Sequence, residues 1–276
     1  MDVYNQIFSP LAVKLHYYMY EVNDFITYYL PFLTVTAYVF YIFIVPRFWE
    51  KNGNLKYAGW NFFLCGLSVC MLLGMGLPWV NEFSKKGFSE MVCAQQESTK
   101  EVMFTYRPMM FWGLVFALSK YFELYDTHTL LRKNPKRNLW QMPLLLHWYH
   151  HVTVLVYTWF SAYYQMPSSY IFATMNAFVH CILYYYYGMA EIGKRPSWGK
   201  YLTIIQIVQM VIGIYVNYIY FGFYFEGVEC AGGNKKTILI SSVIMYGSYL
   251  YLFAKMAVDR WILGKYKAET KKVKAN

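Results

Sequence analysis

The chain has 276 residues, of which 58% are hydrophobic, 22% are aromatic and 14% are charged. A soluble domain typically has about 25% charged residues, so this composition argues against a soluble fold and indicates a membrane protein. The formal net charge of +10 would also suit nucleic-acid binding. We interpret the charge differently, because the basic residues stand in short clusters between apolar runs, as in the cytosolic loops of membrane proteins.

The first 26 residues mix polar and apolar side chains and lack the basic start and short apolar core of a cleavable signal peptide. They predict an amphipathic helix at the membrane interface, with His16 on its surface. Neither a low-complexity linker nor an internal repeat divides the chain. We therefore expect a single membrane domain over residues 1–276, made of an N-terminal segment (1–26), a seven-helix membrane region (27–257) and a basic tail (258–276).

Seven stretches are apolar and close to the roughly 20 residues that a helix needs to cross a membrane. They are 27–46, 58–80, 107–127, 143–164, 168–189, 201–222 and 237–257. The third contains Arg107, Lys120, Glu123 and Asp126, so it spans the membrane only if those groups face the protein interior. The predicted fold class is an all-α membrane protein with seven transmembrane helices.

The connections between these stretches alternate in charge. The basic ones carry Arg47, Lys51 and Lys56; Arg132, Lys133, Lys136 and Arg137; and Lys194, Arg195 and Lys200. Because basic loops tend to stay in the cytosol, we expect the N-terminus on the lumenal side and the lysine-rich C-terminus in the cytosol. The final residues, with Lys272 and Lys274, fit the K-x-K-x-x signal that retrieves membrane proteins to the endoplasmic reticulum. A generic basic tail near anionic lipid is the alternative.

Polar side chains recur at helical spacing on four consecutive predicted spans, and lipid would reject them, so we expect them to face a functional interior. The stripes are Lys120, Glu123, Asp126 and Thr127; His147, His150 and His151; Asn176, His180, Tyr184 and Tyr187; and Thr203, Gln206 and Gln209. All four lie toward the predicted cytosolic ends of their spans. They predict one polar chamber open to the cytosol, with an apolar interior beyond it. A purely structural ion pair between Lys120 and Glu123 is the alternative for that stripe.

The histidine cluster suits either metal binding or covalent catalysis. Membrane di-iron desaturases and hydroxylases use H-x-x-H-H boxes, but they need more histidines than the four available here. A single metal would take three ligands from one helical turn, which is poor tetrahedral geometry. We therefore favour an imidazole that acts as base and as acyl-accepting nucleophile, oriented by Glu123 or Asp126.

These stripes resemble the motifs of the ELO family of fatty acid elongases. The motifs are Lys120-x-x-Glu123-x-x-Asp126-Thr127, His147-x-x-His150-His151, Asn176-x-x-Val179-His180-x-x-Leu183-Tyr184-x-Tyr186-Tyr187 and Thr203-x-x-Gln206-x-x-Gln209. They occur in this order within about residues 105–260. Leu183 departs from the methionine that is usual in the family. The histidine motif preceded by Leu146 is similar to that of members acting on saturated and monounsaturated chains.

The resemblance implies a very-long-chain 3-oxoacyl-CoA synthase of the endoplasmic reticulum, an acyltransferase that condenses malonyl-CoA with a fatty acyl-CoA and releases CoA and carbon dioxide. It implies no metal and no redox cofactor. The implied fold is a barrel of six helices around an acyl tunnel, with a seventh helix outside. A lumenal disulfide between Cys93 and Cys230 is also implied, and both cysteines lie in connections that we predict on the non-cytosolic side. The partners implied are membrane lipid, the two substrates and the reductases and dehydratase of the elongation cycle; a homodimer is one option for assembly, and no nucleic acid is expected.

On this resemblance, His150 accepts the acyl group, and His147, His151 and His180 stabilise the enolate or position the thioester. The implied substrate-binding residues are Lys120, Thr127, Arg132, Lys133, Lys136, Arg137, Asn176, Tyr184, Tyr187, Thr203, Gln206 and Gln209, with Lys194 and Arg195 also at the basic rim that would hold CoA. Two other classes stay open: a histidine-box metal-dependent desaturase or hydroxylase, and a non-enzymatic seven-helix lipid transporter.

Overall fold

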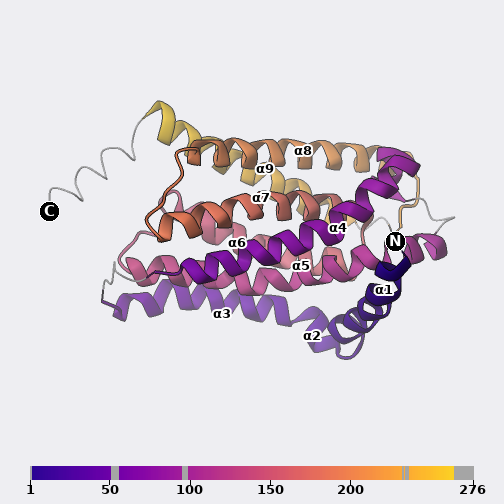
Figure 1. The fold of residues 1–276 in the computed structure, drawn as a ribbon, viewed down its shortest axis with the longest axis horizontal. Coiled ribbons are helices and arrows are strands. Elements are labelled where there is room, and N and C mark those ends of the chain that lie inside the picture. Colours follow the sequence, from indigo (N-terminus) through magenta and orange to yellow (C-terminus); the bar gives the residue numbers. More distant parts are fainter. Residues whose placement is uncertain (1, 51–55, 95–98, 232, 234–235, 264–276) are drawn as a thin grey trace.

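The computed structural model describes residues 2–50, 56–94, 99–231, 233 and 236–263 of the chain. This part is all-α: it is 85% helical and contains no strand. In chain order the helices are α1 (Asp2–His16), η1 (Tyr17–Glu21), α2 (Asp24–Tyr28), α3 (Leu30–Ile44), η2 (Val45–Phe48), α4 (Ala58–Cys93), α5 (Thr99–Lys133), α6 (Leu144–Tyr163), α7 (Pro167–Glu191), α8 (Gly199–Phe225), α9 (Lys236–Ala257) and η4 (Val258–Ile262) (Figure 1). Lys272 and Lys274 lie outside the described residues.

Each stretch predicted as a span overlaps one long helix, from α3 to α9. In the described part of the chain, four segments are long and apolar enough to cross a membrane, namely Leu30–Phe48, Ala58–Cys93, Gly199–Phe225 and Lys236–Ile262. These segments indicate a membrane protein. Length and hydropathy do not identify α5, α6 and α7 as candidate membrane spans. These three helices carry three of the four polar stripes.

Local signals account for several helix ends. Pro167 is the first residue of α7, where its missing N–H has no intrahelical role. Gly193 and Gly227 follow the ends of α7 and α8 with φ of 84° and 74°, a left-handed conformation that glycine adopts without steric cost. Helix α4 continues to Cys93, past the predicted end at residue 80, because polar residues end its hydrophobic run without ending the helix. Gly87 interrupts this last part with a φ of 78°.

Helices α4 to α9 lie side by side along the long axis of the molecule and alternate in direction (Figure 1). Their main contacts follow the order α4–α5–α6–α9–α8–α7 and return to α4, and we call this cycle of contacts the ring. Helix α3 packs on α5 and α6 from outside this ring, where Tyr38 and Ile42 join a cluster with Leu131, Leu139 and Leu144.

A disulfide joins Cys93, at the end of α4, to Cys230 in the α8–α9 connection, which is the pairing that the resemblance implies. Beside it, the backbone N–H of Ala231 donates to the carbonyl oxygens of Cys93 and Ala94 at 3.1 and 2.8 Å. We call this end of the ring the disulfide end. We call the opposite end, where α5 ends at Lys133 and α6 begins at Leu144, the histidine end.

Helix α1 lies against the first half of α5, with the Phe8 and Phe111 ring centroids 5.1 Å apart. The prediction of a surface position for His16 is wrong, because its side chain is buried. Its Nδ1 lies 3.2 Å from the Glu21 carboxylate, and its Nε2 lies 3.0 Å from the side-chain amide nitrogen of Gln165. Helix η1 extends the chain directly from α1 and brings Glu21 back to the imidazole.

Candidate active site

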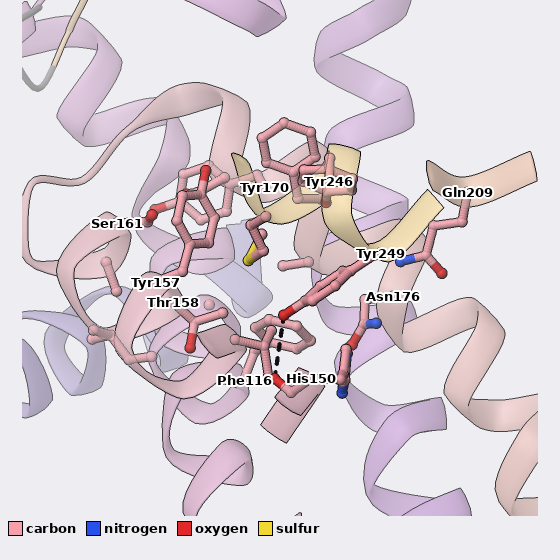
Figure 2. Close-up of a pocket in the computed structure, with 18 of the residues that line it drawn as sticks. Phe116, His150, Tyr157, Thr158, Ser161, Tyr170, Asn176, Gln209, Tyr246 and Tyr249 are labelled. Atoms are coloured by element: carbon pink, nitrogen blue, oxygen red, sulfur yellow. Dashed lines mark hydrogen bonds between the residues drawn. The ribbon is translucent and has the colours of Figure 1, made fainter. Parts of the chain in front are cut away.

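A cavity lies inside the ring between α5, α6, α7, α8 and α9 (Figure 2). At the histidine end it is lined by Phe116, His150, Asn176, Gln209 and Tyr249. Toward the disulfide end it is lined by Tyr157, Thr158, Ser161, Gln165, Ser169 and Tyr170. Each of the five helices adds apolar wall, including Leu114, Val154, Ala173, Met210 and Met245. The cavity thus joins an imidazole and two amides to a long apolar space.

The three histidines of α6 have different surroundings. His150 lines the cavity, whereas the buried His151 lies against His147, with ring centroids 4.5 Å apart. The Nε2 atom of His147 and the Nδ1 atom of His151 have no hydrogen-bond partner among the described residues. Because positions four apart share a helix face, the rings of His147 and His151 meet edge to face, while His150 turns toward the cavity.

Tyr249 of α9 braces the turn of α6 that carries His150. Its hydroxyl donates to the backbone carbonyl oxygen of His150 at 3.2 Å and lies 2.5 Å from the Thr153 hydroxyl. The ring centroids of His150 and Tyr249 are 5.1 Å apart. Figure 2 shows the two residues at the same end of the cavity. The imidazole is therefore held on a turn that is fixed from a neighbouring helix.

Lys120 is completely buried and does not lie at a basic rim, so that part of the prediction is wrong. Its ammonium donates to Glu123 Oε1 at 2.6 Å and to Asn176 Oδ1 at 3.0 Å. The Ser119 hydroxyl donates to the same Glu123 oxygen at 3.1 Å. A carboxylate one turn away on the same helix compensates the buried charge, which is what allows Lys120 to leave the surface.

Glu123 lies near a histidine, but that histidine is on α7 rather than α6. The Nδ1 atom of His180 is 3.7 Å from Glu123 Oε1, and both side chains are almost fully buried. Asn176, one turn earlier on α7, connects this network to the cavity. The carboxylate therefore belongs to a Lys120–Glu123–Asn176–His180 network behind the cavity wall.

Asp126 contacts neither α6 nor an imidazole through its hydrogen bonds, in contrast to the predicted orienting role. Its Oδ1 accepts from Trp60 Nε1 at 2.7 Å, and its Oδ2 accepts from the Tyr184 hydroxyl at 2.7 Å. Both partners lie at the histidine end, on α4 and α7. A single carboxylate thus ties α4, α5 and α7 together beside the cavity.

Comparisons with known proteins identify the family of the chain. The family model described as "ELO: GNS1/SUR4 family" matches residues 25–272. The chain belongs to the ELO family. It is 35% identical over 247 residues to very long chain fatty acid elongase 6 of Mus musculus, covering 87% of each chain. It is 38% identical over 211 residues to fatty acid elongase 1 of Trypanosoma cruzi (75% of this chain and 69% of the relative) and 32% identical over 220 residues to fatty acid elongase 2 of Trypanosoma brucei brucei (77% of each).

Several motif residues of this ELO protein do not line the cavity, so their contact with substrate stays a prediction. Thr127 is fully buried and lies 2.6 Å from the Tyr38 hydroxyl, so it faces α3. Tyr187 is 46% exposed on the outside of α7. Of the three stripe residues on α8, Gln209 lines the cavity, whereas Thr203 is buried and Gln206 is half-buried nearer the histidine end. A ring of helices admits only a narrow face of each helix, so part of every stripe serves helix packing.

The basic residues expected to hold CoA divide into two groups. The guanidinium of Arg132 lies 4.8 Å from the Trp49 ring centroid, and Lys133 forms an ion pair with Glu191. The exposed members of the expected set are Lys136, Arg137, Lys194 and Arg195. The second group remains accessible to an anionic substrate of this ELO protein.

Residues outside the four predicted stripes complete the site. Phe116 lines the cavity and lies under the Lys120 ammonium, 4.1 Å from it, and Trp60 holds Asp126. Tyr246 and Tyr249 line the cavity from α9, and their spacing of three residues was a signal that we did not use. In the described part of the chain, no three His, Cys, Asp or Glu side chains are arranged to hold a metal ion.

Proposed function

We propose that this ELO protein is the condensing enzyme of fatty acid elongation, a very-long-chain 3-oxoacyl-CoA synthase. It joins malonyl-CoA to a fatty acyl-CoA and yields 3-oxoacyl-CoA, CoA and carbon dioxide. Relatives that are named fatty acid elongases support this proposal. The observation that carries it is the position of His150 at the head of an apolar cavity, since this joins a nucleophile to a space for an acyl chain.

The proposal includes a membrane arrangement. All of α3 to α9 cross the membrane of the endoplasmic reticulum, and α4 to α9 form a barrel around the acyl chain. The closed order of helix contacts supports the barrel. The histidine end faces the cytosol and the disulfide end faces the lumen, as supported by the exposed basic residues at one end and the disulfide at the other. The residues 1–276 then act as one domain, retrieved to this membrane through Lys272 and Lys274.

Covalent catalysis by His150 gives a balanced reaction. A ring nitrogen attacks the thioester carbon, the carbon–sulfur bond breaks, and CoA leaves as a thiol with a proton from the imidazole. Malonyl-CoA then loses carbon dioxide, and the electron pair of the broken carbon–carbon bond forms an enolate. The enolate carbon attacks the acyl-imidazole, the new carbon–carbon bond displaces His150, and the imidazole regains a proton from solvent. No metal or redox cofactor enters this scheme.

Asn176 is the side chain best directed to stabilise the oxyanion of these steps. Its Oδ1 is taken by the Lys120 ammonium, so its NH₂ group is left to face the cavity that it lines. A donor held in this way stabilises negative charge without reorganising during the reaction. Gln209 offers a second amide across the cavity (Figure 2). The remaining histidines, His147, His151 and His180, then tune the site from behind the cavity wall.

Purified protein incubated with labelled malonyl-CoA and a panel of acyl-CoAs tests this function. We expect release of carbon dioxide only when an acyl-CoA is present, and mass spectrometry should find an acyl group on His150 when malonyl-CoA is withheld. His150→Ala should abolish both signals, whereas His128→Ala, which alters a histidine packed against Tyr41 and Tyr125, should keep them. Condensation by His150→Ala near the parent rate would rule out the covalent role.

The product of the proposed reaction determines which enzymes must act next. The 3-oxoacyl-CoA product carries a ketone that a reductase, a dehydratase and a second reductase must remove before another round.

CoA would bind at the exposed basic residues Lys136, Arg137, Lys194 and Arg195, whose charge complements its phosphates. Raising the ionic strength should therefore raise the KM for both CoA substrates more than it lowers kcat.

A further inference from the structure

The cavity changes character along its length. Its middle is walled by apolar side chains from all five helices, and its far part adds hydroxyl groups of α6 to apolar side chains such as Met110 and Phe172. Figure 2 shows Tyr157 and Ser161 on the opposite side of the cavity from Asn176, with Thr158 between them and His150. An unsubstituted acyl chain would bring only methylene and methyl groups to this region. The hydroxyls of the far wall therefore find no partner in a plain saturated chain.

One of these hydroxyls, that of Ser161, is buried and unpaired. Ser161 is 2% exposed, and its Oγ has no hydrogen-bond partner among the described residues. Ser242 of α9 is likewise 2% exposed and unpaired, but it does not line the cavity. The hydroxyl of Tyr157 lies beside both serines. Buried polar groups are normally paired, so the unpaired hydroxyl of Ser161 in the cavity wall points to a polar group of a ligand.

The position of the hydroxyls along the cavity can be converted to a chain length. Ser161 lies 11 residues after His150 on the same helix, so at 1.5 Å per residue it is about 16 Å farther along the axis. A zigzag hydrocarbon with bonds of about 1.5 Å advances about 1.25 Å per carbon. An acyl group whose thioester carbon lies at His150 therefore needs about 13 bonds and reaches Ser161 with about its fourteenth carbon.

We propose that Tyr157 and Ser161 form a hydroxyl-binding subsite for the far end of the acyl chain. The substrate class is an acyl-CoA of about 12 to 14 carbons that carries a hydroxyl on or next to its terminal carbon. This hydroxyl donates to the unpaired Ser161 oxygen and accepts from the Tyr157 hydroxyl. The inference rests on the proposed function for the position of the thioester.

Paired substrates test the subsite directly. Purified protein would receive labelled malonyl-CoA with either tetradecanoyl-CoA or ω-hydroxytetradecanoyl-CoA, and kcat/KM would be measured for each. We expect the hydroxylated chain to be favoured by about fivefold, the factor that one neutral hydrogen bond supplies. Ser161→Ala and Tyr157→Phe should each remove most of this preference. Ser68→Ala is the matched control, since this buried serine of α4 donates to the Leu64 carbonyl oxygen and does not line the cavity.

A binding measurement separates failure of the subsite from failure of the proposed function. Each unlabelled acyl-CoA would displace radiolabelled tetradecanoyl-CoA from the protein without malonyl-CoA present. Tighter binding of the hydroxylated chain that is lost in Ser161→Ala supports the subsite even if no condensation is found. Equal or weaker binding of the hydroxylated chain, or a preference that both variants retain, overturns the inference while leaving condensation of plain chains untouched.

Discussion

The Lys120 ammonium and the Glu123 carboxylate lie 2.6 Å apart, with 0% and 2% of their side chains exposed. The same ammonium holds the Asn176 amide that lines the cavity. The pair therefore links the stability of α5 to the orientation of a group beside the candidate nucleophile. Because both charges are buried, removal of one leaves the other without compensation.

Lys120→Met tests this pair. It leaves the Glu123 carboxylate buried and uncompensated, so we expect a loss of about 3–5 kcal/mol in the free energy of unfolding. The double variant Lys120→Met/Glu123→Gln should recover much of that loss, because no charge is then left unpaired. Thermal unfolding in detergent, followed by circular dichroism, measures both. Glu123→Gln alone gives the second single loss. The idea is wrong if the losses of Lys120→Met and Glu123→Gln simply add in the double variant.

Tyr184→Phe tests the role of Asp126 as a tie between helices. The change deletes the hydroxyl that donates to Asp126 Oδ2 and leaves that carboxylate oxygen without this partner. We expect a loss of about 1–3 kcal/mol. Tyr185→Phe is the matched control on the same helix, and this half-exposed tyrosine, 46% exposed, should matter by less than about 0.5 kcal/mol. Equal effects of the two substitutions would contradict the tie.

Gly213→Ala should narrow the cavity from α8. A Cβ atom at this position would lie 2.2 Å from Cε1 of Tyr246, so the ring that lines the cavity must move. We expect a stability loss of about 1–3 kcal/mol from overpacking and a shift of the acyl-CoA panel toward shorter substrates. Gly222→Ala on the same helix meets no atom within 4 Å and serves as the control. An unchanged length profile in Gly213→Ala would show that Tyr246 does not limit the chain.

The disulfide should contribute to stability through the length of chain that it closes. Cys93 and Cys230 are 137 residues apart in sequence, and loss of a native disulfide typically costs about 2–5 kcal/mol. Cys93→Ser/Cys230→Ser should lower the unfolding midpoint, and dithiothreitol should lower that of the parent but not of the variant. Cys70→Ser, which removes an exposed free thiol, should leave the midpoint near that of the parent. A parent midpoint that ignores reductant would refute this contribution.

The helices were predictable from the sequence, because apolar runs of membrane length leave few alternatives to α-helix. The family was also predictable, and the comparisons confirm it. What hydropathy and spacing do not contain is the set of neighbours around each helix. Lys120, Asp126 and Thr127 lie within one stripe of α5, yet their partners differ. Lys120 contacts α7, Asp126 contacts both α4 and α7, and Thr127 contacts α3.

The same limit applies to the cavity. Helical spacing indicated that the histidines of α6 gather on one side, but His147 and His151 contact each other and only His150 lines the cavity. Which of two adjacent positions faces inward depends on a rotation of the helix that α9 sets through Tyr249. Such a rotation arises from packing between residues that are far apart in the chain, so a local pattern does not report it.

The bond between Cys93 and Cys230 closes the intervening chain into one covalent circuit. Every residue that we assign to condensation, from Lys120 to Gln209, lies inside this circuit. A protease that nicks the α5–α6 or α7–α8 connection therefore leaves two pieces that stay tethered until a reductant frees them. A nick between α3 and α4 falls outside the circuit. It leaves the N-terminal helices without a covalent link to the rest of the chain, even before a reductant is added.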